Sequence, residues 1–272
     1  MTRLVLALFH VAIAAWSAVA GSSRMTCWIS GGSKSPDCAA PVLFREFTLA
    51  NAPTNANLSI AIAGWHEVRV NGKKVGDEVL TPVTCQPDMR ISSVNRNVAR
   101  FLVAGTNTIE VLLGNGWYNC FTREVWGFVH ASWLDEPMIR GTLFVDGNPL
   151  LATDSSWRAY DSPIVFNALR NGEWYDARLE NSRSRERSVT VERYSPAGLV
   201  SPEDAVPCRV CETFEPVCVV DGSDGRRVFD FGANYNLTTN DMRHRGFVLD
   251  RIWDGIFFQL LQPVSLSNVF PF

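Results

Sequence analysis

Short stretches of alternating apolar and polar residues, separated by turns rich in glycine and asparagine, recur along this sequence. Residues 58–62 and 108–113 alternate with a period of two, which is typical of a β-strand with one buried face. Residues 68–75 surround Asn71-Gly72, a dipeptide that readily takes the positive φ of a two-residue hairpin turn. No long amphipathic helix with capping residues occurs beyond the start of the chain. Many short strands joined by turns predict an all-β fold, as a β-sandwich or jelly roll.

The composition is that of a folded protein without a basic surface. Hydrophobic residues make up 46% of the 272 residues and charged residues 19%, which leaves enough apolar material for a core. The formal net charge is -3. We therefore expect neither nucleic acid nor an anionic membrane surface as a partner.

The N-terminus has the three parts of an export signal. Arg3 gives a positive start, residues 4–20 are almost wholly apolar, and residues 18–20 have the small-x-small form that signal peptidase cuts. A membrane anchor is the alternative, but the apolar run is shorter than the roughly 20 residues of a spanning helix, and His10 interrupts it. We predict that residues 1–20 are a signal peptide and that the mature chain is secreted or periplasmic, with no membrane attachment after cleavage.

The rest of the chain divides at a proline-spaced segment. Residues 21–195 carry most of the strand pattern and are predicted to form the sandwich. Residues 196–236 begin as a surface linker and continue into apolar strands, near 217–220 and 227–232, that open a second β-domain. From residue 237 to residue 272 the composition changes, and we expect a divergent tail there.

Several short motifs follow one another in a specific order between about Trp28 and Asn234. They are NGKKVGD with LTP (71–77 and 80–82), LVAGTN (102–107), LLGNGWY (112–118), DSSWR (154–158), NGEWYDAR (171–178), ETFEP (212–216) and DFGAN (230–234). The series resembles the N-terminal region of bacterial α-L-rhamnosidases. This resemblance implies a galactose-binding-like jelly-roll β-sandwich, followed by the first strands of a second β-domain.

In the family that this sequence resembles, a helical toroid further along the chain hydrolyses terminal L-rhamnose with a pair of carboxyl groups. The catalytic stretch of the family is absent here, and the sequence ends before such a toroid could begin. The resemblance therefore implies a non-catalytic, carbohydrate-associated module, as a truncated or frame-shifted product, with a rhamnose-containing glycan as its partner. Two alternatives remain. The chain could act with a catalytic domain on another chain, or it could be a structural or decayed fragment without a ligand.

The resemblance also implies that L-rhamnose is held through a calcium ion, which prefers oxygen ligands. The oxygen donors near predicted loop corners are Glu67, Asn71, Asp77, Asn115 and Asn119, and the flat apolar faces for the sugar ring are Trp65, Trp117 and Tyr118. Asn71 and Asn115 are the candidate calcium ligands, whereas Glu67, Asn115, Trp117 and Tyr118 are the candidate carbohydrate ligands. A structural role competes in each case, because asparagine suits tight turns and large aromatic side chains can cover the end of a sandwich.

Two charged stretches are predicted to have structural roles. Glu173 and Asp176 could suggest a catalytic pair, but on one extended strand they would point to opposite faces. Arg178 is predicted to form a salt bridge that secures the last strand. Residues 183–187 carry charges without a catalytic pattern, and they predict a solvated loop.

Overall fold

The computed structural model describes residues 26–32, 39–83, 86–121, 127–169, 171–192, 196, 198–210, 213, 218–221 and 227–230. Its strands are β1 (Trp28–Ser30), β2 (Pro41–Leu49), β3 (Ala56–Ala63), β4 (Trp65–Val70), β5 (Lys73–Lys74), β6 (Arg90–Asn97), β7 (Gly105–Gly114), β8 (Met138–Val145), β9 (Asn148–Ala152), β10 (Arg158–Asp161), β11 (Ile164–Ala168), β12 (Gly172–Tyr175), β13 (Ser184–Ser188), β14 (Thr190–Glu192), β15 (Leu199–Pro202), β16 (Cys218–Asp221) and β17 (Arg227–Asp230). Short 3-10 helices are η1 (Ala99–Phe101), η2 (Phe128–His130) and η3 (Ala177–Leu179). The predicted signal peptide (1–20) and the predicted tail (237–272) lie outside the described residues.

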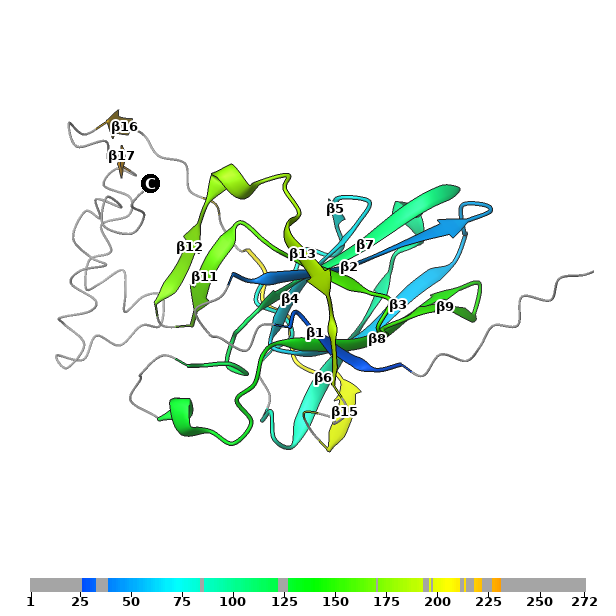
Figure 1. The fold of residues 1–272 in the computed structure, drawn as a ribbon, viewed down its shortest axis with the longest axis horizontal. Helices are drawn as coiled ribbons and strands as arrows, with labels where there is room; N and C mark the ends of the chain where they lie inside the picture. The colour runs from blue at the N-terminus through cyan, green and yellow to red at the C-terminus, as the bar shows by residue number, and fades with distance from the viewer. Residues whose placement is uncertain are drawn as a thin grey trace, which may run out of the picture.

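Two sheets form the main body of the molecule (Figure 1). The seven-stranded sheet has the order β14-β1-β8-β3-β6-β15, with β9 paired to β8, and the six-stranded sheet has the order β13-β10-β2-β7-β4-β5. Buried side chains from both sheets form one apolar cluster between them. The predicted all-β jelly-roll sandwich is therefore confirmed.

The core lies between the sheets because every second residue of each central strand points inward. On β7, Ile109, Val111 and Leu113 are fully buried, whereas Glu110 and Leu112 alternate with them and are only partly buried. The inward residues belong to the main apolar cluster. The outward residues are left to form the outer face of the six-stranded sheet, where the candidate site lies.

The arginine-rich segment was predicted to be a solvated loop, and this prediction is wrong. Ser184–Ser188 forms strand β13, which pairs antiparallel with β10 at the end of the six-stranded sheet. Arg187 anchors the strand, because its guanidinium donates to a carboxylate oxygen of Asp161 at 2.7 Å and to the carbonyl oxygen of Gly31 at 2.6 Å. Charged residues on such an outer strand also discourage pairing with another chain.

Part of the predicted linker joins the first sandwich. Leu199–Pro202 forms β15 and runs parallel to β6. The strands predicted near residues 217–220 and 227–232 are present as β16 and β17, which pair with each other. None of the helices in the described ranges has the length and hydrophobicity needed to span a bilayer.

Candidate functional site

The corner that follows β7 is held together by Asn115. The backbone N–H of Asn115 donates to Oδ1 of Asn167 at 2.8 Å, and its Nδ2 donates to the carbonyl oxygen of Asn167 at 2.8 Å. Its Oδ1 accepts a hydrogen bond from Nδ2 of Asn119 at 3.0 Å. The Asn115 side chain is buried. Its polar atoms therefore join this corner to β11.

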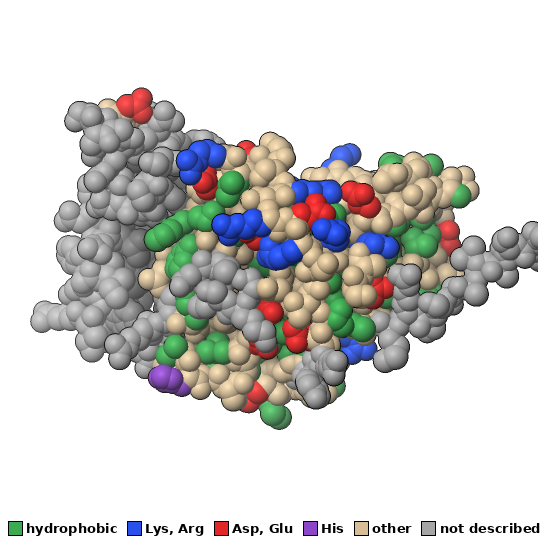
Figure 2. Space-filling model, in the orientation of Figure 1, with side chains coloured by type: hydrophobic (Ala, Val, Ile, Leu, Met, Phe, Trp, Pro, Cys, Tyr) green, Lys and Arg blue, Asp and Glu red, His purple; other side chains and the backbone are tan. Residues whose placement is uncertain are grey.

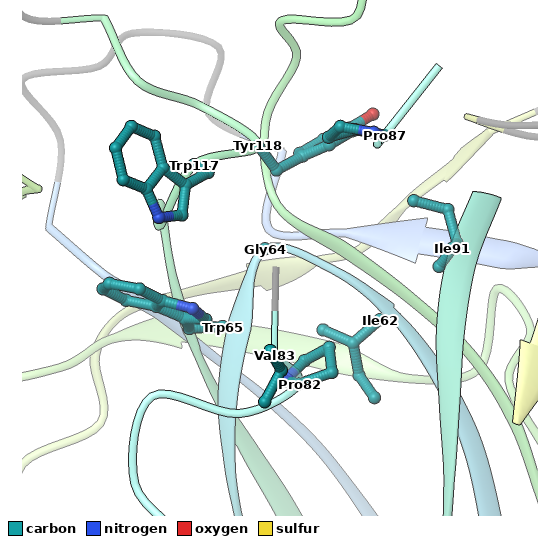
Figure 3. A pocket seen from close by; sticks show the side chains of 9 residues that line it. All are labelled: Ile62, Gly64, Trp65, Pro82, Val83, Pro87, Ile91, Trp117 and Tyr118. Carbon is teal, nitrogen blue, oxygen red and sulfur yellow. The ribbon is translucent and has the colours of Figure 1, made fainter. Parts of the chain in front are cut away.

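Trp117 and Tyr118 line a small cavity together with Trp65 (Figure 3). The cavity volume is about 30 Å³, which accommodates a water molecule but not a sugar ring. Tyr118 packs in a second apolar cluster with Met138, and burial raises the pKa of its hydroxyl group. The Trp117 ring meets the ring of Phe128 edge to face, with centroids 5.5 Å apart. In this corner, packing accounts for both aromatic residues.

Asn71 lies at the opposite end of β4 and does not share a site with Asn115. Its φ of 51° is the positive value that the hairpin turn requires. Its Nδ2 donates to Oδ1 of Asn107 at 2.9 Å, and its Oδ1 accepts from the backbone N–H of Thr108 at 2.9 Å. Thr108 lies within β7 and Asn115 directly follows it, so the two residues are roughly 20 Å apart at about 3.3 Å per strand residue.

The two candidate calcium ligands, Asn71 and Asn115, therefore do not belong to one site. Asn71 and Asn115 are too far apart to ligate one ion, since calcium–oxygen distances are only about 2.3–2.6 Å. In the part of the chain that the structure describes, no group of three or more histidine, cysteine, aspartate and glutamate side chains is arranged to hold a metal.

A larger groove lies on the outer face of the six-stranded sheet. Its volume is about 490 Å³, within the range of roughly 300–1,000 Å³ that is usual for small-molecule sites. β4 and β7 form its floor and the β11–β12 hairpin forms a wall. Its lining includes Trp65, Glu67, Leu112, Ile164, Asn167 and Glu173. We call this space the Trp65 groove.

Glu67 is the charged candidate that faces the Trp65 groove. Its carboxylate accepts from Arg69 at 2.7 Å and from Lys74 at 2.8 Å. Burial acts to raise the pKa of Glu67, but the hydrogen bonds and positive charges of Lys74 and Arg69 lower it below its usual value. The Glu67 side chain is 25% exposed, so an ionised acceptor remains accessible from the groove.

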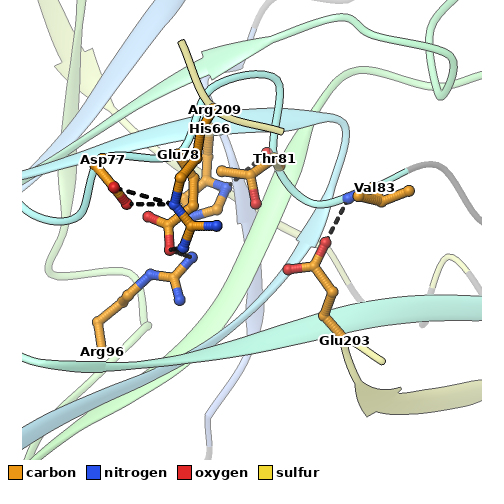
Figure 4. A network of polar contacts seen from close by, with 8 residues as sticks. All are labelled: His66, Asp77, Glu78, Thr81, Val83, Arg96, Glu203 and Arg209. Atoms are coloured by element: carbon orange, nitrogen blue, oxygen red, sulfur yellow. Dashed lines mark hydrogen bonds and ion pairs between the residues drawn. The ribbon is translucent and has the colours of Figure 1, made fainter. Parts of the chain in front are cut away.

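Glu203 and Arg209, which follow strand β15, hold the opposite rim of the Trp65 groove in place (Figure 4). The guanidinium of Arg209 donates to Asp77 at 3.0 Å and approaches Glu78 at 3.6 Å. The Glu203 carboxylate accepts from the backbone N–H of Val83. Sequence reasoning missed these contacts, because they join segments more than 100 residues apart along the chain.

Buried His66 supports the same rim. Its backbone N–H donates to the Thr81 carbonyl oxygen at 2.9 Å, and its Nδ1 lies 2.9 Å from that oxygen (Figure 4). Burial lowers the pKa of His66 to about 4. The imidazole is therefore neutral at physiological pH, with the Nδ1 proton directed at the carbonyl oxygen.

The hairpin separates the two carboxylates that could suggest a catalytic pair. Glu173 lines the Trp65 groove, whereas Asp176 caps η3 by accepting from the backbone N–H of Arg178. The Arg178 guanidinium also binds the Asp176 carboxylate at 2.8 Å and 2.7 Å. The predicted salt bridge of Arg178 is confirmed, but it stabilises a turn rather than a strand.

A family model for the α-L-rhamnosidase N-terminal domain matches residues 51–215 of this chain. The chain belongs to this family. An α-L-rhamnosidase of Formosa agariphila is 29% identical over 218 residues, which cover 72% of this chain and 22% of that protein. The chain thus spans about a fifth of the length of that curated relative.

Solved structures agree with this assignment. The α-L-rhamnosidase of Dictyoglumus thermophilum aligns with a TM-score of 0.62 at 26% identity, over 76% of this chain and 25% of that one. The Streptomyces avermitilis α-L-rhamnosidase, solved in complex with L-rhamnose, aligns with a TM-score of 0.60 at 24% identity, over 71% and 20%. The second likeness shows the shared fold.

In this rhamnosidase N-terminal domain, recognisable motifs often mark structural positions. Trp157 of DSSWR is 3% exposed, and its Nε1 donates to the carbonyl oxygen of Ala152 at 2.9 Å. Asn107 of LVAGTN is 1% exposed, and its side chain bonds to both the N–H and the carbonyl of Val103. Both motif residues therefore have structural roles, since their polar atoms bond to the backbone of this domain.

Proposed function

We propose that this chain is a non-catalytic carbohydrate-binding module of an α-L-rhamnosidase, and that the Trp65 groove binds a rhamnose-containing glycan. The observation that carries the proposal is the pairing of an aromatic side chain with an ionised acceptor in one groove of about 490 Å³. Sugars present an apolar face of C–H groups and an edge of hydroxyl groups. Trp65 offers a surface for the apolar face, and Glu67 offers oxygen atoms that accept hydrogen bonds from hydroxyl groups.

The state of Glu67 supports a binding role rather than hydrolysis. A glycosidase needs one carboxylic acid that is still protonated near neutral pH, and this requires a raised pKa. The cations beside Glu67 lower its pKa instead. The α-L-rhamnosidases of Formosa agariphila and Dictyoglumus thermophilum are much longer than this chain. In our proposal, hydrolysis is carried out by a different domain.

We also propose that the module works outside the cytoplasm, in the secreted or periplasmic compartment. The apolar stretch at residues 4–20, which ends in small residues, supports this proposal. N-terminal sequencing of the protein exported by an expressing bacterium tests it. The expected first residue is Gly21, and retention of residues 1–20 in the cell fraction would contradict export.

Calorimetric titration of the purified chain with L-rhamnose tests the binding function. The wild-type chain is expected to release heat, and Trp65→Ala is expected to bind about tenfold more weakly or worse, since a tenfold change corresponds to about 1.4 kcal/mol. Trp174→Ala is the matched control, because this tryptophan is 59% exposed and does not line the Trp65 groove. The titration is run with calcium and with a chelator.

The outcomes separate the alternatives. Absence of heat in both conditions would reject the binding function. Release of nitrophenol from a nitrophenyl rhamnoside by this chain alone would instead reject the non-catalytic role. Equal weakening by Trp65→Ala and Trp174→Ala would place the ligand elsewhere.

A further inference from the structure

A second cleft continues from the Trp65 groove across the same face of the six-stranded sheet. Its volume is about 530 Å³, and Leu112 and Ile164 line both spaces. The side chains that distinguish it are Arg69, Glu110, Tyr160, Tyr175, Glu180 and Arg183. We call this space the Tyr160 cleft. The shared residues show that the two spaces are neighbouring parts of one surface depression.

The strand register places the two spaces in line. Tyr160 pairs with Val42, Val42 with Leu112, and Leu112 with Glu67. These residues therefore form one row across β10, β2, β7 and β4. Adjacent strands are about 4.8 Å apart, so Tyr160 and Glu67 stand roughly 14 Å from each other. A single pyranose ring cannot reach from one to the other.

The Tyr160 cleft has the mixed lining that a sugar needs. Val42, Leu112 and Ile164 provide apolar surface. Above it, the Tyr160 hydroxyl donates to the Glu110 carboxylate at 3.1 Å. Burial and the Glu110 charge raise the pKa of Tyr160 to about 12, so the hydroxyl keeps its proton at neutral pH. Donor and acceptor atoms thus lie beside an apolar floor.

Arg183 completes the polar side of the Tyr160 cleft without making it cationic. Its guanidinium lies 4.3 Å from the centroid of the Phe44 ring and within 3.1 Å of Glu46. A second nitrogen is 3.9 Å from Glu110. Figure 2 shows Lys and Arg side chains interspersed with Asp and Glu on the face of the molecule in view. Paired charges of both signs favour a neutral polyhydroxyl ligand over an anion.

We propose that the Tyr160 cleft is a second sugar subsite, which binds the hexose next to the rhamnose unit of the same glycan. This inference rests on the proposed function, because the first unit is the one held in the Trp65 groove. It makes the preferred ligand an oligosaccharide rather than free L-rhamnose. Glu110 and Tyr160 bind hydroxyl groups of the second unit, and Val42 and Leu112 support its apolar face.

Calorimetric titration with three sugars tests the second subsite. The probes are L-rhamnose, rutinose (L-rhamnose linked to glucose) and a rhamnosyl-rhamnose disaccharide. The wild-type chain is expected to bind at least one disaccharide about tenfold more tightly than L-rhamnose, as one or two additional hydrogen bonds and packing of the second ring would give. Glu110→Gln and Tyr160→Phe are expected to remove this preference while leaving the affinity for L-rhamnose unchanged.

A neighbour on the same sheet face provides the control. Arg158 precedes Tyr160 by two residues on β10 and pairs with Glu186 at 2.6 Å, but it does not line the cleft. Arg158→Gln should keep the disaccharide preference. Melting temperatures of all variants show whether each one is folded.

The results distinguish the two proposals. If L-rhamnose binds and both disaccharides bind no more tightly, the second subsite is rejected and the proposed function stands. If Glu110→Gln weakens L-rhamnose and the disaccharides equally, the cleft is not a separate subsite and the inference is also rejected. If no sugar binds to the wild-type chain, both proposals fail.

Discussion

Replacement of Asn115 by alanine separates a structural role from a ligand-binding role. The side chain donates to the Asn167 carbonyl at 2.8 Å and accepts from Asn119 at 3.0 Å. It is 7% exposed, so water cannot readily take the place of these partners. We expect Asn115→Ala to lower the free energy of unfolding and to leave sugar affinity unchanged at temperatures where the variant is folded.

The expected size of the effect follows from the hydrogen bonds. Each lost side-chain bond contributes about 1 kcal/mol net, and the Asn167 carbonyl that loses its donor costs about 1 kcal/mol more. Asn115→Ala should therefore reduce the free energy of unfolding by about 3 kcal/mol. At roughly 2–4 °C per kcal/mol for a domain of about 150–250 residues, the melting temperature should fall by about 6–12 °C.

Thermal and urea unfolding, followed by tryptophan fluorescence, measure this loss. Asn148→Ala is the control, because that exposed asparagine makes one long hydrogen bond, of 3.2 Å, to the Asp146 carbonyl in the β8–β9 turn. The control should stay within about 0.5 kcal/mol of the wild type. An Asn115→Ala variant that melts like the wild type, but no longer binds L-rhamnose, would refute the structural role.

Three further predictions concern the fold. The pKa of His66 is about 4 in the folded chain against 6.5 as its reference value, so the unfolded chain takes up the proton first as the pH falls. Stability should decline by about 2 kcal/mol from pH 7.5 to pH 5, and His66→Gln should lack this part of the decline in urea melts. Gly141→Ala would place its Cβ 2.7 Å from the Ser59 carbonyl oxygen, so separation of β3 and β8 should cost about 1–3 kcal/mol; an unchanged melting temperature would contradict this. Asn107→Ala should cost about 3 kcal/mol in the same assay, since it removes buried bonds to the backbone of Val103; a loss below about 1 kcal/mol would show that other groups replace them.

Much of the sandwich could be predicted because its strands follow local rules. Residues 108–113 alternate in the sequence, and the same residues alternate between core and surface in β7. The Asn71 turn follows from a dipeptide preference and is present with φ of 51°. Strand β13 was not predicted, because its arginine, serine and glutamate residues show no alternation of apolar and polar side chains. Its pairing depends on Asp161, which only the folded chain brings close.

The candidate site was harder to predict because distant segments build it. Glu67 was identified from its place near a predicted corner. The other residues that line the Trp65 groove include Ile164 and Glu173, which come roughly 100 residues later in the sequence. The LTP motif predicted the loop at the rim of the groove. It gave no indication that Glu203 binds Val83 or that Arg209 binds Asp77 on either side of that loop. Tyr160 gave no sequence signal, and Arg183 was noted only as part of a charged stretch, since a cleft across four strands depends on the register between them.

Hydrogen-bond satisfaction explains why the asparagines and the charged residues have different roles. The side-chain amides of Asn71 and Asn115 are engaged with partners inside the protein, so a ligand would have to break existing bonds to reach them. Glu67 and Glu110 also have partners, but an ionised carboxylate has about four acceptor positions and these side chains are 25% and 19% exposed. A sugar hydroxyl can add a hydrogen bond there without displacing Arg69. Ligand binding is therefore expected at the surface ion pairs of the six-stranded sheet, while the asparagine corners keep the strands in place beneath them.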